Sequence, residues 1–444
     1  MTTHPQYSGV HRRIAQHLPL LSAVLWLFGT SLNMRAQDSA RVINERLLLD
    51  LSLIDAPYAQ SAARMACNKR LGIASDGSTS PTAIDWLRGY ESPSMQQALA
   101  ITKDLHSTNY YFTNKLWNRW LKPTTRKRLF LNRLLANAQA GVVDYGLAYH
   151  GMVFGPVWLH EEFHRNGLTL RGISSFDDTY YRFGGGSPGG SVSEVYDADM
   201  ARFKAEAPQE MVRTFAAGIE GQYALVRGLQ RDNFYLDTDQ PNAAMNILIT
   251  KQAVDYLRLF LEPDYDQSVD SMGAFGDEEH ERDFVGWDFT AWVYDMHRPD
   301  EPYSARGTHP SGVGIDREIK RSDLTAEEEA YLQRMGDLHY LNFLSPSMLG
   351  VHRIRLSQRT GFNFAVRHIL TSFGYDLGGD LFFDRNGRKW MLGIHTYHNH
   401  NNLFAGIELE RYELRTGRGS KAVQLDLRGM LWVQPKNEAF YATQ

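Results

Sequence analysis

The sequence predicts an α+β fold, in which a mainly helical part is followed by a C-terminal antiparallel β-meander. Apolar residues recur at helical spacing through much of the chain up to about residue 350. From about Gly361 the pattern changes to an alternation of apolar and polar residues, which is typical of strands with one covered face. The length of 444 residues favours two domains over one, and a hydrophobic fraction of 43% is sufficient for a sizeable core.

The first 36 residues are expected to form a secretory signal peptide. A basic stretch at 11–13 precedes the compact apolar run Leu18–Phe28, and Ala36 is the expected last residue of the signal. The apolar run is shorter than the roughly 20 residues needed to cross a bilayer, which favours cleavage over an uncleaved anchor. We therefore expect an exported protein of a bacterial periplasm or outer membrane.

The remaining chain is expected to divide into a helical domain at 37–355 and a β module at 356–444. Helical periodicity is clearest in five segments: Arg41–Ile54, Met95–Leu105, Arg128–Leu135, Pro208–Arg231 and Ala326–Gly336. Residues 138–159 are strongly apolar but are interrupted by Asp144, His150 and Pro156. A charged residue in the middle of a membrane is costly, so we expect a buried helix here instead of a membrane span.

The β module is predicted from four alternating segments, Asp376–Asp384, Arg388–Tyr397, Leu403–Leu414 and Lys421–Val433. The turn at 385–387 contains Asn-Gly, which is the strongest short signal for a hairpin. Membrane-embedded sheets also use strands of roughly 9–11 residues, so membrane association through this module is left open. The histidines at 395, 398 and 400 are interpreted as exposed loop residues, with a second metal site as the alternative.

A metal-binding motif stands at 160–164, where the chain reads His-Glu-Glu-Phe-His. On a helix, positions i and i+4 share one face, so His160 and His164 can bind the same zinc ion. Glu161 follows the first histidine and is placed to take a proton from a zinc-bound water instead of binding the metal. Gly155-Pro156 suits the start of this helix and Asn166-Gly167 suits its end.

Glu220 is the expected third ligand. It lies in the predicted helix Pro208–Arg231 among small and apolar residues, where an unpaired carboxylate is costly. Gly218 and Gly221 would let this helix approach the motif helix closely. Pairing of Glu220 with Arg213 or Arg227 is the competing interpretation, and Asp178 and Glu194 are the other candidate ligands.

This pattern resembles the gluzincin type of zinc metallopeptidases, which carry H-E-x-x-H on one helix and a glutamate on a later helix. The resemblance covers about residues 145–231, and only the five-residue motif is specific. It implies that His160, His164 and Glu220 bind zinc and that Glu161 is the catalytic base. It also implies a hydrolase that cleaves peptide bonds in a peptide or protein substrate.

The composition excludes some other classes of partner and metal site. The net charge of −4 provides no basic field, so nucleic acid is not an expected partner, and the single cysteine excludes cysteine-rich zinc modules. Two rival functions are kept, an inactive zincin-like protein and an outer-membrane or envelope structural protein. A donor for the developing oxyanion is sought among Tyr223, His280 and His297.

Overall fold

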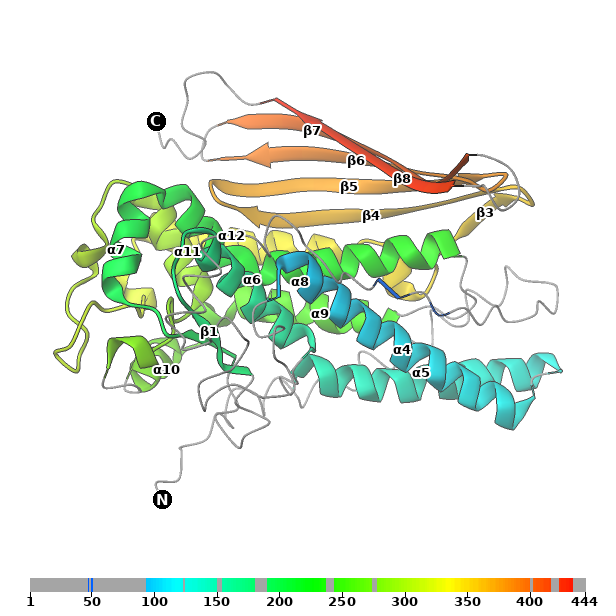
Figure 1. Cartoon of the computed structure of the whole chain (residues 1–444), viewed down its shortest axis with the longest axis horizontal. Coiled ribbons are helices and arrows are strands. Elements are labelled where there is room, and N and C mark those ends of the chain that lie inside the picture. Colours follow the sequence, from blue (N-terminus) through cyan, green and yellow to red (C-terminus); the bar gives the residue numbers. More distant parts are fainter. Residues whose placement is uncertain are drawn as a thin grey trace.

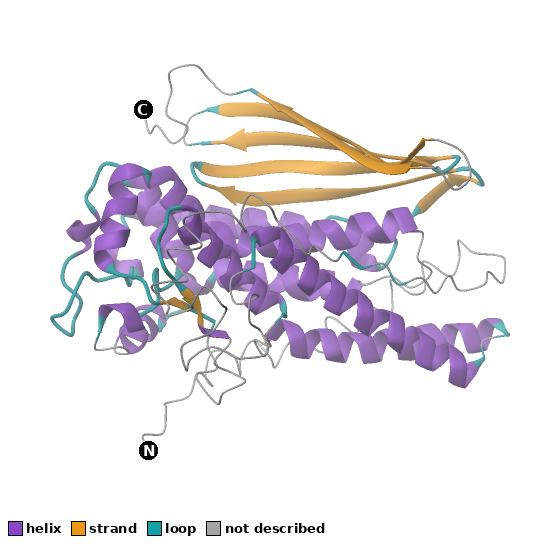
Figure 2. Ribbon diagram, in the orientation of Figure 1, coloured by secondary structure: helices purple, strands orange, loops and turns teal. Residues whose placement is uncertain are grey.

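The computed structural model describes residues 47, 49–50, 93–122, 124–149, 154–179, 190–236, 243–273, 278–399, 402–416 and 423–433. The predicted signal peptide and almost all of the predicted helix Arg41–Ile54 lie outside these residues. The described chain has a helical body with a six-stranded antiparallel sheet over one side of it, as Figures 1 and 2 show. The predicted α+β class is therefore confirmed.

The helical body is built from helices of very different lengths. The α-helices are α4 (Met95–Leu121), α5 (Arg126–Tyr149), α6 (Pro156–Leu170), α7 (Asp197–Glu206), α8 (Pro208–Leu236), α9 (Ala243–Leu257), α10 (Tyr265–Gly273), α11 (Asp288–His297) and α12 (Ala326–His339). Short 3₁₀ turns connect some of them: η3 (Leu259–Leu261), η4 (Glu279–Glu281), η5 (Tyr303–Arg306), η6 (Arg321–Asp323), η7 (Tyr340–Phe343) and η8 (Pro346–Leu349). In the described part of the chain, every helix is too short or too polar to cross a lipid bilayer.

Local sequence signals explain where several helices begin. At α12, the Thr325 side chain accepts a hydrogen bond from the Glu328 backbone, and the Glu328 side chain accepts one in return from the Thr325 backbone. This reciprocal cap satisfies two backbone donors that a helix start leaves free. Ser94 and Gln97 form the same arrangement at α4. The apolar stretch at 138–159 is shared between the end of α5 and the start of α6, so the prediction of one buried helix over this stretch is wrong.

The sheet follows the helices in the chain and is a simple meander. Its strands, in spatial and sequence order, are β3 (Ile354–Ser357), β4 (Thr360–Thr371), β5 (Gly374–Arg385), β6 (Arg388–His398), β7 (Leu403–Thr416) and β8 (Val423–Trp432). The predicted hairpin joins β5 to β6, where Asn386 and Gly387 have φ angles of 55° and 77°. Two consecutive positive φ values are what a tight hairpin turn requires, and Asn-Gly tolerates them.

The change from helix to strand at Ile354 lies next to the predicted start of the β module at 356. The division of the chain into two domains stays a prediction, since the sheet shares a core with the helices. Phe234 and Tyr235 of α8 pack in one apolar cluster with residues from four strands, namely Ala365, Phe382, Met391 and Tyr412.

The sheet face that covers α8 also carries buried charges, which we call the ionic layer. The Arg227 guanidinium of α8 donates to both oxygens of Asp380 at 2.9 Å and to Glu408 at 2.7 Å. Arg367 lies 2.9 Å from the same aspartate. The pairs of Arg227 tie α8 to strands β5 and β7, and the pair of Arg367 joins β4 to the same aspartate of β5.

His395 belongs to this buried face, so its interpretation as an exposed loop histidine is wrong. It lies within β6, is 6% exposed, and has its Nδ1 atom 2.6 Å from a carboxylate oxygen of Asp376. The reason is the alternation within β6, which places His395 on the same face as Met391, toward the helices. A two-stranded sheet of β1 (Phe176–Asp177) and β2 (Val192–Ser193) completes the fold beside α6.

Candidate metal centre

The motif residues lie on α6, a buried helix in the interior of the body. Gly155 is the residue before the helix and Pro156 occupies its first turn, as predicted. His160, Glu161 and His164 are all less than 9% exposed. The expected end at Gly167 is wrong, because the helix continues to Leu170.

Gly167 has a packing role that explains why α6 does not end there. A Cβ atom at this position would lie 2.6 Å from the Thr214 hydroxyl oxygen of α8. The glycine therefore allows close contact between the two helices and does not serve as a cap.

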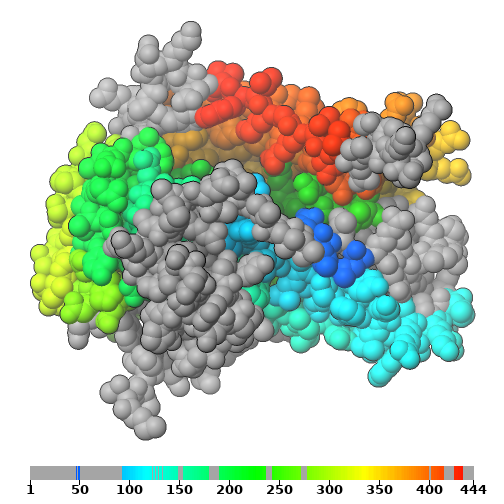
Figure 3. All heavy atoms as spheres, in the orientation of Figure 1, coloured from blue at the N-terminus to red at the C-terminus, as the bar shows by residue number. Residues whose placement is uncertain are grey.

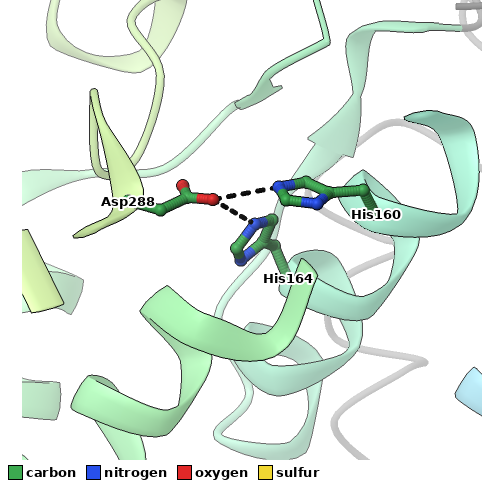
Figure 4. Close-up of side chains that lie close together, drawn as sticks. All are labelled: His160, His164 and Asp288. Carbon is green, nitrogen blue, oxygen red and sulfur yellow. Dashed lines mark hydrogen bonds and ion pairs between the residues drawn. The ribbon is translucent and has the colours of Figure 1, made fainter. Parts of the chain in front are cut away.

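The two imidazoles converge on the carboxylate of Asp288, the first residue of α11 (Figure 4). The Nε2 atoms of His160 and His164 lie 2.9 Å and 3.2 Å from the same oxygen, Oδ2 of Asp288. All three side chains are buried. The structure thus brings together one ligand atom from each of three residues, within 4.8 Å of one another.

These distances fit a bound metal ion. Two ligands at about 2.05 Å from a tetrahedral zinc ion are separated by about 3.3 Å. The measured nitrogen–oxygen separations of 2.9 Å and 3.2 Å are close to this value. Two imidazole nitrogens and one carboxylate oxygen are also a common donor set for catalytic zinc, which leaves a fourth position for water or substrate.

A backbone hydrogen bond prepares His164 for this role. Its Nδ1 atom lies 2.6 Å from the carbonyl oxygen of Thr214 in α8. A carbonyl only accepts, so Nδ1 must carry the proton, and the lone pair of the neutral ring is then on Nε2. Metal-binding histidines are oriented in the same way in most proteins.

Helix α8 forms the opposite side of the site and approaches α6 through glycines, as the sequence predicted. A Cβ atom on Gly218 would clash with the His160 imidazole, and one on Gly221 would lie 2.8 Å from the Phe163 ring. Each glycine therefore makes room for a particular ring of α6.

The prediction that Glu220 completes the site is wrong. Its carboxylate forms an ion pair with Arg213 at 2.7 Å, and 36% of its side chain is exposed. The physical reason is the helical periodicity, because Glu220 is rotated by about 200° from Gly218, the residue that faces His160. The competing interpretation, a salt bridge with Arg213, is the one that the structure shows.

Asp178 is close to the site but is engaged otherwise, and Glu194 lies outside the ligand group. Asp178 accepts hydrogen bonds of 2.7 Å from the hydroxyls of Ser191 and Ser193. Burial raises its pKa to about 6 in spite of these bonds.

Glu161 is adjacent to the ligand group without belonging to it. Burial, together with the negative charges of Asp283 and Asp288, raises the pKa of Glu161 well above its usual range. The exposed residue Gly190 lies directly against it, since a Cβ atom there would be 2.5 Å from a carboxylate oxygen of Glu161. At this point the Glu161 carboxylate is thus in contact with an exposed residue that has no side chain.

The surrounding charges also favour a cation. Burial and the neighbouring Asp288 raise the pKa of Asp283 to about 7. Burial alone would raise the pKa of Asp288 as well, but the two imidazoles lower it well below its usual range. Several buried carboxylates near one point need compensating positive charge, which a divalent ion supplies.

Titration directions of the two histidines differ. Burial lowers the pKa of His160. Burial acts in the same direction on His164, but the charge and hydrogen bond of Asp288, together with the Thr214 carbonyl and the charge of Asp283, outweigh it and raise the pKa. In the metal-free protein, His164 is therefore the more basic of the two rings that face the carboxylate.

The three expected oxyanion donors contact residues outside the ligand group. The Tyr223 hydroxyl is hydrogen-bonded to His339, the His280 ring stacks on Tyr196, and His297 contacts a backbone carbonyl of its own helix. Tyr256 of α9 lies nearer to the site, with its ring 5.8 Å from that of His160.

Sequence reasoning missed Asp288 and Tyr256. Asp288 stands at the start of α11, after an acidic, loop-rich stretch in which five other acidic residues at 277–283 offer equal candidates. A carboxylate at a helix start is also a common cap-region residue, so the sequence carried no specific signal for it.

No protein-family model, curated protein or solved structure matches this chain. The site is therefore interpreted from its own geometry.

Proposed function

We propose that this protein is an exported zinc-dependent hydrolase that cleaves peptide bonds. The observation that supports the proposal is the convergence of His160, His164 and Asp288, with Glu161 beside the group. A purely structural metal site would need no buried glutamate next to its ligands. Peptide bonds are proposed as the substrate because the motif resembles that of zinc metallopeptidases.

Zinc, when bound, lowers the pKa of a coordinated water to about 7 and polarises a carbonyl group. The other steps of the proposed reaction are assigned to residues of the chain. His160, His164 and Asp288 would hold the ion, and the backbone of Thr214 keeps the His164 ring oriented. The carboxylate of Glu161 would take a proton from the attacking water and return it to the leaving amine.

Glu161→Gln tests the proposal. The amide has nearly the same shape, so zinc content and thermal midpoint should hardly change. Hydrolysis of a peptide library should fall by about 10²–10⁴-fold, which is the usual contribution of a general base. Glu220→Gln is the matched control, because it alters a half-exposed glutamate outside the ligand group and should cleave like the wild type.

Equal cleavage by Glu161→Gln and the wild type would refute peptide hydrolysis at this site. If the wild type binds zinc but neither protein cleaves any peptide, the zinc-binding scaffold becomes the better interpretation.

A further inference from the structure

The two faces of the C-terminal sheet have opposite character. Side chains alternate between the two faces along each strand, and the ionic layer lies on the face toward α8. The same face carries all the carboxylates of β5 and of residues 403–411 in β7, namely Asp376, Asp380, Asp384, Glu408 and Glu410. Among the described residues, no carboxylate lies at an outward position in β5, β6, β8 or residues 403–411 of β7. Most of them are large apolar side chains.

These outward apolar side chains form a continuous surface, which we call the outer face. Eight of them are between 41% and 76% exposed: Phe383, Trp390, Ile394, Leu403, Ile407, Leu409, Leu427 and Leu431. The strand register makes them neighbours, since Phe383 pairs with Trp390, and Ile407 pairs with both Ile394 and Leu431. In the space-filling view, β7 and β8 form the orange-to-red upper surface of the molecule (Figure 3).

Cations are concentrated at one end of the outer face. Arg385 and Arg388 are exposed on either side of the β5–β6 turn, and the Arg411 guanidinium lies 4.7 Å above the Trp390 ring. A hollow at this end is lined by Arg388, Arg411, Trp390, Leu409 and Leu427, and also by Arg428, which is ion-paired with Glu408 of the ionic layer. The carboxylates that also line it, Glu410 and Glu413, lie within ion-pair distance of Arg231 and Lys389.

The composition of the outer face indicates what can cover it. Its apolar side chains lie beside the exposed Arg385 and Arg388, and the outward positions described above hold no carboxylate. A second copy of the same face would offer these arginines no carboxylate to pair with, whereas apolar residues beside arginine and tryptophan are typical of contact with a lipid surface.

We propose that the outer face binds the surface of a membrane that contains acidic lipids. The apolar side chains of β5–β8 enter the boundary of the acyl chains, and the arginines at the β5–β6 end contact the anionic headgroups. This binding does not depend on the metal centre, which lies on the other side of α8 among the helices.

Sedimentation with lipid vesicles tests this proposal on the purified protein. Vesicles of phosphatidylcholine and phosphatidylglycerol should bind it, and vesicles of phosphatidylcholine alone should bind it less. The double variant Ile394→Glu/Ile407→Glu should weaken vesicle binding by about tenfold or more. The reason is that two half-exposed apolar side chains are no longer transferred from water into the lipid when the protein binds. Arg385→Gln/Arg388→Gln should remove the preference for the acidic vesicles.

Val142→Glu/Leu170→Glu is the matched control, with two apolar residues of the helical body that are 73% and 63% exposed. It should bind vesicles like the wild type. Should the double sheet variant misfold, as judged by near-ultraviolet circular dichroism, Leu431→Glu on the edge strand replaces it, since that side chain is 76% exposed.

Three results would overturn the proposal. The first is a wild type that stays in solution with both kinds of vesicle. The second is a folded sheet variant that sediments as well as the wild type. The third is a dimer in analytical ultracentrifugation that the sheet variant abolishes, since a second copy would then cover the outer face.

Discussion

Substituting Gly218 by alanine should damage the metal centre through one added methyl group. The new Cβ atom would overlap the His160 imidazole, so either the ring or helix α8 must move. Ordinary contact requires a separation of at least 3.4 Å, which means a displacement of about 1 Å. Metal–ligand distances tolerate only about 0.2 Å of error. We therefore expect zinc affinity to fall by about 10- to 100-fold, as it does when the groups that orient a ligand are altered.

Gly221→Ala is the matched control on the same helix. Its Cβ atom would lie 2.8 Å from the Phe163 ring, so it also disturbs the packing of α6 against α8, but it does not meet a ligand. Overpacking costs about 1–3 kcal/mol, and the better helix propensity of alanine offsets up to about 1 kcal/mol of this. Both variants should consequently lose a few degrees in thermal midpoint.

Competition with a chromophoric zinc chelator measures the affinity, and scanning calorimetry of the metal-free proteins measures the stability. The expected result is a similar loss of midpoint in both variants and a loss of zinc affinity in Gly218→Ala alone. Equal zinc affinity in the two variants would refute the reasoning, because the glycine at 218 would then have no special relation to the His160 ring.

Three further predictions concern charged groups. Asp288→Ala should lose zinc at chelator concentrations that leave the wild type loaded, whereas Glu220→Ala should keep its zinc. If Glu220→Ala loses zinc and Asp288→Ala keeps it, the third ligand is Glu220 of α8 and not Asp288. In the metal-free protein, the lowered pKa of Asp288 stabilises the folded state above the ordinary carboxyl pKa, and this contribution disappears as the pH falls. Denaturant midpoints of metal-free wild type should therefore decline between about pH 5 and 2 more steeply than those of metal-free Asp288→Asn, and parallel curves would contradict this. Arg227→Leu should destabilise the protein by about 1.5–3 kcal/mol in urea unfolding, because Asp380 and Glu408 lose the partner that they share but keep Arg367 and Arg428. A change below about 1 kcal/mol would show that the ionic layer contributes little net stability.

The strands and the motif helix could be predicted because their signals are local. Alternation located β5 to β8 within a few residues, and Asn386-Gly387 identified the hairpin between β5 and β6. The spacing of His160 and His164 placed both rings on one helix face. Each of these inferences depends only on the spacing of residues along the chain or on the residue types in one turn.

The third ligand could not be predicted because it depends on tertiary contacts. Asp288 is 124 residues beyond His164 and is carried by a different helix, so no spacing rule connects them. Glu220 looked suitable because its neighbours in the chain are small. Those small residues serve the contact of α8 with α6, and the glutamate between them is turned toward Arg213.

The ionic layer also has a consequence for the order in which the molecule folds. Arg227 is separated from Asp380 by 153 residues and from Glu408 by 181, whereas the strands of the meander pair with their immediate neighbours. Hairpins form through short loops, but contacts of such large sequence separation are slow. During synthesis, Arg227 of α8 must therefore remain without these partners until β7 has followed, and docking of the completed sheet is expected to be the late step of folding.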